Sequence, residues 1–367
     1  MKKINLLQVV FGIMSGGVER MLLNYFSGEE FKDYNLYIAY FGKPDERCLE
    51  EFKKCGFQTI RLHTKTKNRL KCYKEIKSVL KKYKIDIVHS NINIENYLVM
   101  KAAYDCNIPI RISHSHGLPE PTNNFLRKEY RKIKIYLGNK YSTCNFACSD
   151  KAGKYLFGKN KYRLIYNAME TSIFRFDDKM RKKIREELDI KDSIVIGYVA
   201  RFNNGKNHDF LIDIFDKMDI KNKNVKVIFI GAGPFKQRLE EKIKMLELQN
   251  NIFLLSSKQN IYDYYQAMDL FVFPSSEEGL GMVAIESQIN GLYCICSTGV
   301  PIDTKISDNI IYLDLIPDLW IREITKNLKL REDNKMAVYD DGKYNIFKQR
   351  IVLYNLYKEL INEKNGD

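Results

Sequence analysis

The stretch that decides the fold class is LFVFPSSEEGLGMVAIE, residues 270–286. An apolar run ends at Pro274, a polar loop with two glycines follows, and a helical pattern begins near Met282. This order of strand, loop and helix is the repeating unit of parallel α/β sheets. Glu278 falls in the loop and Glu286 in the first turns of the helix, so both carboxylates can approach one ligand. Acidic pairs are common, and the placement of this pair after a buried strand makes it specific.

The same alternation extends in both directions and predicts two doubly wound α/β domains, with ligands at the carboxyl ends of the strands. Polar residues collect between Tyr166 and Phe176, so we place the domains at residues 1–170 and 171–343. The helix expected over residues 344–367 has an apolar face, and we expect it to pack back on the first domain. The expected strands are Ile4–Phe11, Leu36–Tyr40, Thr59–Leu62, Ile85–Ser90, Ile110–Ser113, Asn145–Cys148, Arg163–Ile165, Ile194–Ala200, Val225–Ile230, Ile252–Leu255, Leu270–Pro274, Tyr293–Ser297 and Ile310–Leu313.

Composition restricts the class of protein. The 367 residues are 45% hydrophobic and 29% charged, as in soluble globular proteins, and no apolar run reaches the roughly 18 residues of a membrane span. The run Ile4–Met14 imitates a signal peptide, but Asn5 and Gln8 interrupt it, so we interpret it as a first strand in a cytoplasmic protein. The eight cysteines form no Cys-x-x-Cys pair and are interpreted as reduced thiols, with a metal site as the alternative.

The net charge of +14 is carried by the first half of the chain. Residues 1–170 hold 31 Lys and Arg against 16 Asp and Glu, whereas the remaining residues hold 29 against 30. The excess is densest in a predicted amphipathic helix, Lys65–Lys84, and a second cluster lies between Arg127 and Lys134. Three interpretations remain open: a solvated helix face, attraction to an anionic membrane surface or lipid-linked substrate, and nucleic-acid binding, which no accompanying motif supports.

Two loops that follow predicted strands have the composition of phosphate sites. Ser15, Gly16 and Gly17 open a helix, where glycines let a ligand approach the backbone and free N–H groups attract phosphate. The motif is not G-x-G-x-x-G, so a plain tight turn is the alternative. Arg201 and Lys206 lie five residues apart after another strand, and a guanidinium with an ammonium suits a diphosphate. Two ordinary surface cations are the alternative there.

Histidines follow two predicted strands of the first domain. His114 and His116 alternate at the end of one strand, and His89 lies at the end of another. Two histidines separated by one residue could bind a metal, but no Asp-x-Asp and no nearby carboxylate cluster completes a divalent site. We therefore expect a polar, substrate-facing role without a metal, with a structural histidine as the alternative at each position.

Taken together, these segments resemble the retaining glycosyltransferases of the GT-B architecture, glycosyltransferase family four, and within it the bacterial capsular and exopolysaccharide branch. The resemblance covers almost the whole chain and is most specific at Phe273–Glu286. The sequence departs from the family pattern at Tyr166, Ala168 and Tyr293, which concern loops more than the site. The other supporting segments are Gly16–Arg20, Ala147–Gly158, Ile165–Met169, Gly197–Lys206 and Ile230–Pro234.

The resemblance implies two Rossmann-like domains facing a central cleft, and it implies roles for individual residues. Arg201 and Lys206 match the cations that bind the donor diphosphate. Glu286 matches the carboxylate that holds the ribose, and Glu278 the one that faces the donor sugar. His116 matches a first-domain histidine near that sugar, and the repeated Ser-His leaves His114 as an alternative. The donor-binding loops are implied at Gly16, Gly17, Gly233, Gly279, Leu280 and Gly281.

The resemblance also implies the function. We expect transfer, with retention, of a sugar from a nucleotide-diphosphate donor, UDP-linked, to a growing glycan on a polyprenyl-diphosphate lipid, in capsule or exopolysaccharide synthesis. No metal or further cofactor and no nucleic acid is expected, and the protein should lie peripherally on the anionic inner face of the membrane. A nucleotide-sugar epimerase of the same architecture, which would act on the donor alone, is the first alternative. A basic nucleic-acid-binding protein, with steep salt dependence, is the second.

Overall fold

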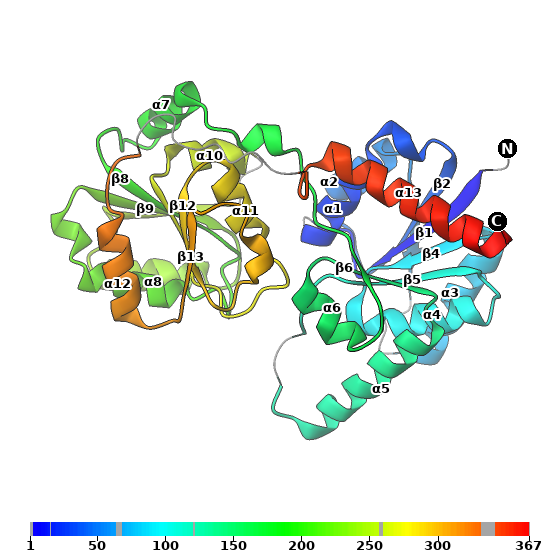
Figure 1. Cartoon of the computed structure of the whole chain (residues 1–367). Coiled ribbons are helices and arrows are strands. Elements are labelled where there is room, and N and C mark those ends of the chain that lie inside the picture. The colour runs from blue at the N-terminus through cyan, green and yellow to red at the C-terminus, as the bar shows by residue number, and fades with distance from the viewer. Residues whose placement is uncertain are drawn as a thin grey trace. The chain divides into compact units, whose positions relative to one another are not determined.

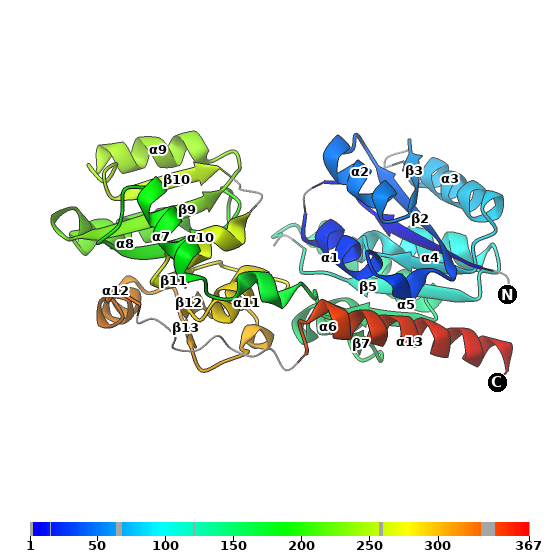
Figure 2. The same ribbon diagram turned by 90° about the horizontal axis from the view of Figure 1, so that it is seen from above.

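The computed structural model describes residues 3–14, 16–63, 68–119, 122–256, 260–331 and 342–366. The chain forms two compact units, one of residues 1–170 with 341–367 and one of residues 171–340. In each unit helices cover a parallel sheet (Figures 1 and 2). The prediction of two doubly wound α/β sheets is therefore confirmed.

A parallel sheet of seven strands, counted over the described residues, forms the centre of the first unit. Its strands are β1 (Ile4–Val10), β2 (Tyr34–Phe41), β3 (Gln58–Leu62), β4 (Ile87–Ser90), β5 (Ile110–Ser115), β6 (Cys144–Ala147) and β7 (Arg163–Leu164). They lie in the order β3-β2-β1-β4-β5-β6-β7. The order reverses between β1 and β4, and the carboxyl ends at such a reversal are where doubly wound sheets bind ligands.

Helices cover both faces of this sheet. They are α1 (Gly17–Phe26), α2 (Glu46–Lys54), α3 (Arg69–Lys82), α4 (Asn96–Tyr104), α5 (Phe125–Tyr141), α6 (Asp150–Phe157) and α13 (Ile346–Asn365). Buried side chains of α1, α2 and α13 form one core with the sheet, and those of α3 and α4 form another on its opposite face (Figure 1). Strands covered on both faces are apolar on both faces, which explains why their sequences are nearly continuous apolar runs.

The C-terminal helix α13 belongs to the first unit although the whole second unit precedes it in the chain. Its Leu353 and Tyr357 are 2% and 0% exposed, whereas Phe347 and Ile351 on its other side are each 54% exposed. Of the apolar residues in this helix, only those on one stripe are therefore buried against the sheet. That stripe carries a phenol into the centre of the first unit.

The second unit is built in the same way. Its parallel sheet has the order β10-β9-β8-β11-β12-β13, and α7 packs against α10 while α8 packs against α9 and α12. The strands are β8 (Ile194–Val199), β9 (Val225–Gly231), β10 (Ile252–Ser256), β11 (Leu270–Phe273), β12 (Tyr293–Ser297) and β13 (Ile310–Leu313). The helices are α7 (Asp178–Glu187), α8 (His208–Lys217), α9 (Lys236–Met245), α10 (Ile261–Ala267), α11 (Met282–Ile289) and α12 (Pro317–Lys326).

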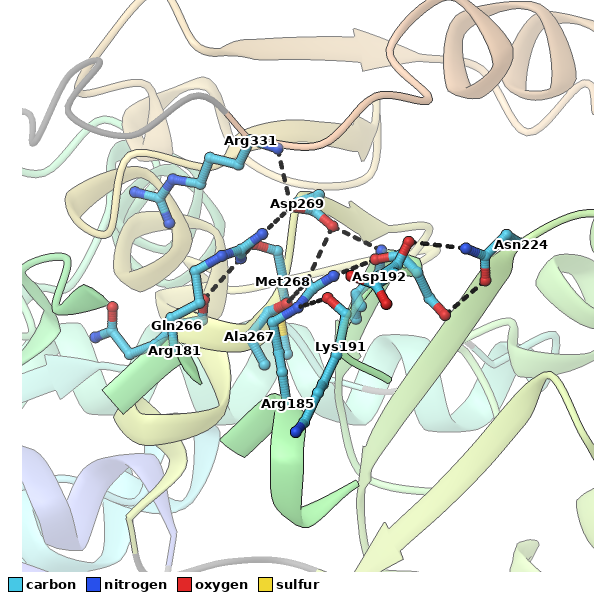
Figure 3. Close-up of polar contacts among 12 residues, drawn as sticks. Arg181, Arg185, Lys191, Asp192, Asn224, Gln266, Ala267, Met268, Asp269 and Arg331 are labelled. Carbon is cyan, nitrogen blue, oxygen red and sulfur yellow. Dashed lines mark hydrogen bonds and ion pairs between the residues drawn. The ribbon is translucent and has the colours of Figure 1, made fainter. Parts of the chain in front are cut away.

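A buried carboxylate connects the elements of the second unit at the start of β11. Asp269 accepts hydrogen bonds from Arg181 and Arg185 of α7, at 2.5 and 3.3 Å, and from the backbone N–H groups of Val195 and Arg331, at 2.8 and 2.9 Å (Figure 3). The two guanidinium groups also donate to backbone carbonyls, including that of Ala267 at 2.7 Å. Asp269 therefore holds α7, β8 and β11 together.

The structure agrees closely with the strand positions expected from sequence. All thirteen expected strands occur, with ends that differ by at most two residues. The basic helix expected over Lys65–Lys84 begins at Arg69 and ends at Lys82, while residues 64–67 lie outside the described residues. Asn68 explains where it starts, because its side-chain oxygen caps the helix at the N–H of Lys71.

Candidate functional site

The second unit brings Lys206 and Glu278 together from two loops that are 72 residues apart. The Lys206 Nζ atom forms an ion pair with the Glu278 carboxylate and lies 3.4 Å from Ser275 Oγ. The two charged side chains are 22% and 15% exposed. Their loops meet because β8 and β11, which precede them, are neighbours in the sheet. Two of the residues predicted for the site are therefore in direct contact.

Hydrogen bonds that the sequence did not reveal hold these two loops. The buried Tyr198 hydroxyl donates to the carbonyl of Lys206. Asn207 has a left-handed φ of +54° and donates its side-chain amide to the carbonyl of Pro274 at 2.7 Å and to Ser276 Oγ at 2.8 Å. Asn adopts a left-handed backbone more readily than most residue types, whereas nothing in the sequence points to the contact of Tyr198.

Arg201 lies on the same loop as Lys206, and its side chain is exposed. Among the residues that the structure describes, no ion pair of Arg201 is found. The loop thus offers one guanidinium open to solvent and one ammonium held beside a carboxylate. An anion at Lys206 and a hydroxyl at Glu278 would lie next to each other, and this combination is what a phosphorylated sugar presents.

Glu286, the fifth residue of α11, makes a separate contact. The Tyr265 hydroxyl donates to its Oε2 atom at 2.7 Å. Burial raises the pKa of Glu286 to about 7, although the bond from Tyr265 lowers it. The carboxyl group is therefore close to half protonated at neutral pH, so small changes of pH decide whether it is a charged acceptor.

The loop between Glu278 and Glu286 is shaped by glycine. Gly281 has a φ of +96° and precedes α11, and a Cβ atom there would come within 3.2 Å of Phe273 and of Val300. Leu280 is only 4% exposed and anchors the loop in the core. Gly281 has no side chain to cap α11, and the Ala284 N–H in the first turn donates to the Gly281 carbonyl at 3.0 Å.

The backbone conformation and close packing at Gly233 explain why a glycine occupies this position. Its φ is +157°, and a Cβ atom would lie 2.3 Å from the carbonyl oxygen of Phe202. The loop after β9 therefore packs directly on the loop after β8. A role of Gly233 in donor binding stays a prediction.

In the first unit, the glycine loop before α1 already holds an anionic group. The Glu19 carboxylate accepts hydrogen bonds from the backbone N–H groups of Gly16 and of Glu19 itself, while burial raises its pKa. The open helix start expected at Gly16 and Gly17 is thus capped by a side chain one turn ahead, and phosphate would have to replace it. Ser15 lies outside the described residues.

The three histidines predicted for the site meet at the carboxyl ends of β4 and β5. His89 Nε2 lies 3.0 Å from His114 Nδ1, and the rings of His114 and His116 are 3.9 Å apart. Burial lowers the pKa of all three, to about 3 for His89 and for His116, so each is neutral at physiological pH. His116 also bonds Asn91 and Asn93, at 2.8 and 2.7 Å.

In the described part of the chain, no group of three or more His, Cys, Asp or Glu side chains is arranged to hold a metal ion. The helices described here include none that combines the length and the apolar composition of a membrane span.

Replacing the Glu286 carboxyl group by an amide is expected to raise the stability of the protein at high pH and to weaken its binding of a nucleotide. The folded-state pKa of about 7 lies above the ordinary glutamate value of 4.5, so ionising the buried group opposes folding increasingly as pH rises between these values. Glu286→Gln should therefore be more stable than the wild type at pH 8 and equally stable near pH 4. The same variant should bind a nucleoside diphosphate more weakly at pH 8, because an ionised acceptor is lost.

Unfolding titrations at the two pH values and calorimetry with the bare nucleotide check both parts. Tyr264→Phe is the control: it changes a residue of α10 next to Tyr265 but leaves the Glu286 carboxyl group and its bond to Tyr265 in place. Equal nucleotide affinity of the wild type and Glu286→Gln at pH 8 would contradict the assignment of Glu286 to the ribose.

Comparisons with known proteins show what this chain is similar to. The family model described as "Glycosyl transferases group 1" matches residues 180–310, which include Lys206, Glu278 and Glu286. The putative glycosyltransferase EpsF of Bacillus subtilis is 26% identical over 80% of this chain and 79% of that protein. The capsular polysaccharide biosynthesis glycosyltransferase CapH of Staphylococcus aureus is 28% identical over 71% of this chain and 75% of its own.

A third relative and a solved structure extend the comparison. The N-acetylgalactosamine-N,N'-diacetylbacillosaminyl-diphospho-undecaprenol 4-alpha-N-acetylgalactosaminyltransferase of Campylobacter jejuni is 23% identical over 78% of each chain. HepE of Anabaena, solved with UDP-glucose, covers 97% of this chain and 100% of its own with a TM-score of 0.78 at 16% identity, which shows a shared fold. The chain thus matches the group 1 glycosyltransferase model over residues 180–310, is similar to named glycosyltransferases, and shares the two Rossmann-like units of GT-B structures, and these findings together support an enzyme that transfers sugars.

Proposed function

We propose that the protein is a retaining glycosyltransferase of family four that moves a sugar from a UDP-sugar to a lipid-linked glycan in capsule or exopolysaccharide synthesis. The observation that carries this proposal is the contact of Lys206 with Glu278 beside the glycine loop before α11. The names of the relatives support the substrates: one acts in capsular polysaccharide synthesis, and another is named for a diphospho-undecaprenol acceptor. A fold shared with a UDP-glucose complex supports the donor.

In this proposal the chain's own groups stabilise the leaving group. When the bond between sugar and diphosphate breaks, negative charge grows on the phosphate oxygens. We assign Lys206, Arg201 and the first amides of α11 to the stabilisation of that charge, because preorganised donors of this kind are usually the largest contribution to such catalysis. Glu286 holds the ribose, and Glu278 accepts from a hydroxyl of the donor sugar. Transfer with retention comes from the family resemblance, with no carboxylate assigned as nucleophile.

The first unit is proposed to bind the acceptor at the membrane surface. Its helix α5 exposes large apolar side chains among cations: Phe125, Leu126, Ile133 and Tyr136 are between 56% and 76% exposed. By contrast, α3 buries Cys72, Ile76 and Leu80 and supplies mainly positive charge. A helix with exposed apolar and basic side chains suits the interface of an anionic bilayer.

Transfer to a defined acceptor tests the proposal. Nucleotide sugars that raise the unfolding temperature should be turned over only when a polyprenyl-diphosphate-linked saccharide is supplied, and turnover should survive EDTA because the cations are side chains. Activity on the donor alone would favour an epimerase, and restoration by Mg²⁺ after chelation would contradict the proposed role of Lys206 and Arg201. The protein should also sediment with anionic vesicles at low salt, and nucleic acid should not compete.

A further inference from the structure

The histidine cluster of the first unit is connected to α13 by hydrogen bonds whose direction can be derived. Asn91 Nδ2 lies 3.3 Å from the backbone carbonyl of His89, which can only accept, and 2.8 Å from Gln8 Oε1. The contact with the backbone carbonyl shows which atom of the Asn91 amide is the nitrogen. Because that nitrogen also faces Gln8, it shows which atom of the Gln8 amide is the oxygen. Gln8 therefore presents its nitrogen to Tyr357 Oη, at 3.2 Å, and to His89 Nδ1, at 3.4 Å.

The tautomers of His89 and His114 follow from that direction. The phenol oxygen of Tyr357 accepts from Gln8, so its own proton is free to be donated to His89 Nδ1 at 2.6 Å. His89 then carries its proton on Nε2 and donates it to His114 Nδ1 at 3.0 Å. His114 must in turn carry its proton on Nε2. Once Tyr357 donates to His89, each further step follows because a neutral imidazole has one donor and one acceptor.

The side-chain amide of Asn91 also determines the tautomer of His116, here through its oxygen, which accepts a hydrogen bond. Asn91 Oδ1 faces His116 Nε2 at 2.8 Å and accepts its proton, which leaves a lone pair on His116 Nδ1. Among the described residues, neither His114 Nε2 nor His116 Nδ1 has a hydrogen-bond partner, although both atoms are buried. The cluster thus ends in one unpartnered donor and one unpartnered acceptor on rings 3.9 Å apart.

A cavity lies next to the backbone of His116. Asn93, which accepts from the backbone N–H of His116 at 2.7 Å, and Gly117, the next residue, both line a cavity of about 270 Å³. A hydroxyl group can both accept and donate, so a polyhydroxylated ligand is the class of molecule that can use this pair of ring atoms. Unmade hydrogen bonds of buried groups are costly, which is the reason to expect such a ligand or a water there.

We propose that Tyr357 is a positioning residue for sugar transfer: its phenol fixes His89 and His114 as Nε2-protonated tautomers, so that His114 offers a donor and His116 an acceptor to hydroxyl groups of the substrate. The role of Tyr357 in sugar transfer rests on the proposed function, whereas the assignment of the tautomers does not. It explains why a C-terminal helix that follows the second unit returns to the core of the first. It also assigns roles to both histidines of the Ser-His-Ser-His sequence.

The first test measures the tautomers directly in the full-length protein. Histidine ¹⁵N–¹H spectra of the wild type should show His89, His114 and His116 as neutral Nε2-protonated rings. In Tyr357→Phe, which keeps the ring but removes the 2.6 Å bond, His89 and His114 should become mixtures of tautomers while His116 stays unchanged. A wild-type His114 protonated on Nδ1, or a Tyr357→Phe spectrum identical to that of the wild type, would overturn the proposal.

The second test measures transfer. Tyr357→Phe should lower kcat at least tenfold, whereas Tyr354→Phe, one turn earlier on α13 and in ring contact with Phe31 and Tyr34, should stay near wild-type activity. Altered tautomers with unchanged transfer would refute the positioning role. If the wild type transfers no sugar, the proposed function fails, but the spectra still decide the tautomers. Equal losses in both variants would show a structural effect only and would also overturn the role.

Discussion

Lys206→Ala should reduce turnover by roughly 10²-fold or more, which is the size of effect seen when one preorganised donor to a developing oxyanion is removed. In the proposed mechanism, the charge that grows on the leaving diphosphate lies at the Lys206 ammonium. Glu278 and Ser275 contact this ammonium, and the Tyr198 hydroxyl donates to the backbone carbonyl of Lys206. Arg201→Ala should have an effect of the same order through the second cation. Steady-state kinetics with saturating donor measure both.

The ion pair with Glu278 gives a second reason why Lys206→Ala would lose activity, and a second variant separates the two reasons. Lys206→Ala leaves a partly buried carboxylate without its partner, and this alone could weaken donor binding. Glu278→Gln, combined with Lys206→Ala, removes the unpaired charge, so donor binding measured by calorimetry should recover relative to Lys206→Ala, while turnover should stay below that of Glu278→Gln alone if Lys206 acts on the leaving group. Lys217→Ala, an exposed cation at the far end of α8, is the matched control. Full activity in both Lys206→Ala and Arg201→Ala would exclude the diphosphate assignment.

The largest loss of stability is expected from Asp269→Ala. This carboxylate has no exposed surface and compensates two guanidinium groups that are themselves only 10% and 5% exposed. Removing one partner of a buried ion pair strands the other, at a cost of about 3–5 kcal/mol. Here Arg181 and Arg185 would both lose their only carboxylate seen in the described residues, and the N–H groups of Val195 and Arg331 would lose an acceptor.

Urea unfolding followed by circular dichroism measures this effect in the second unit. Asp213→Ala is the control, because Asp213 pairs with Lys242 at 2.6 Å but is 57% exposed, and such surface pairs contribute about 0–1 kcal/mol. Similar losses in the two variants would show that the network in Figure 3 contributes no more than a surface pair.

The sequence by itself determined the two α/β units and the positions of their strands. Apolar runs such as Leu270–Phe273 and Val225–Gly231 can be recognised because strand formation and burial on both faces of a parallel sheet act on consecutive residues. The sequence also singled out Gly281, which has a left-handed φ of +96° directly before α11. The charge of the first half of the chain is likewise a property of composition.

Only the tertiary structure decided which groups meet. The pair of Lys206 with Glu278, the bond of Tyr357 to His89, and the four donors around Asp269 join residues that are between 62 and 268 positions apart, and nothing in local periodicity encodes such contacts. Glu19 has taken the helix start that was expected to be open, because its carboxylate reaches back one turn. The raised pKa of Glu286 and the tautomers of the histidines are consequences of burial and of partners, which exist only once distant elements have packed together.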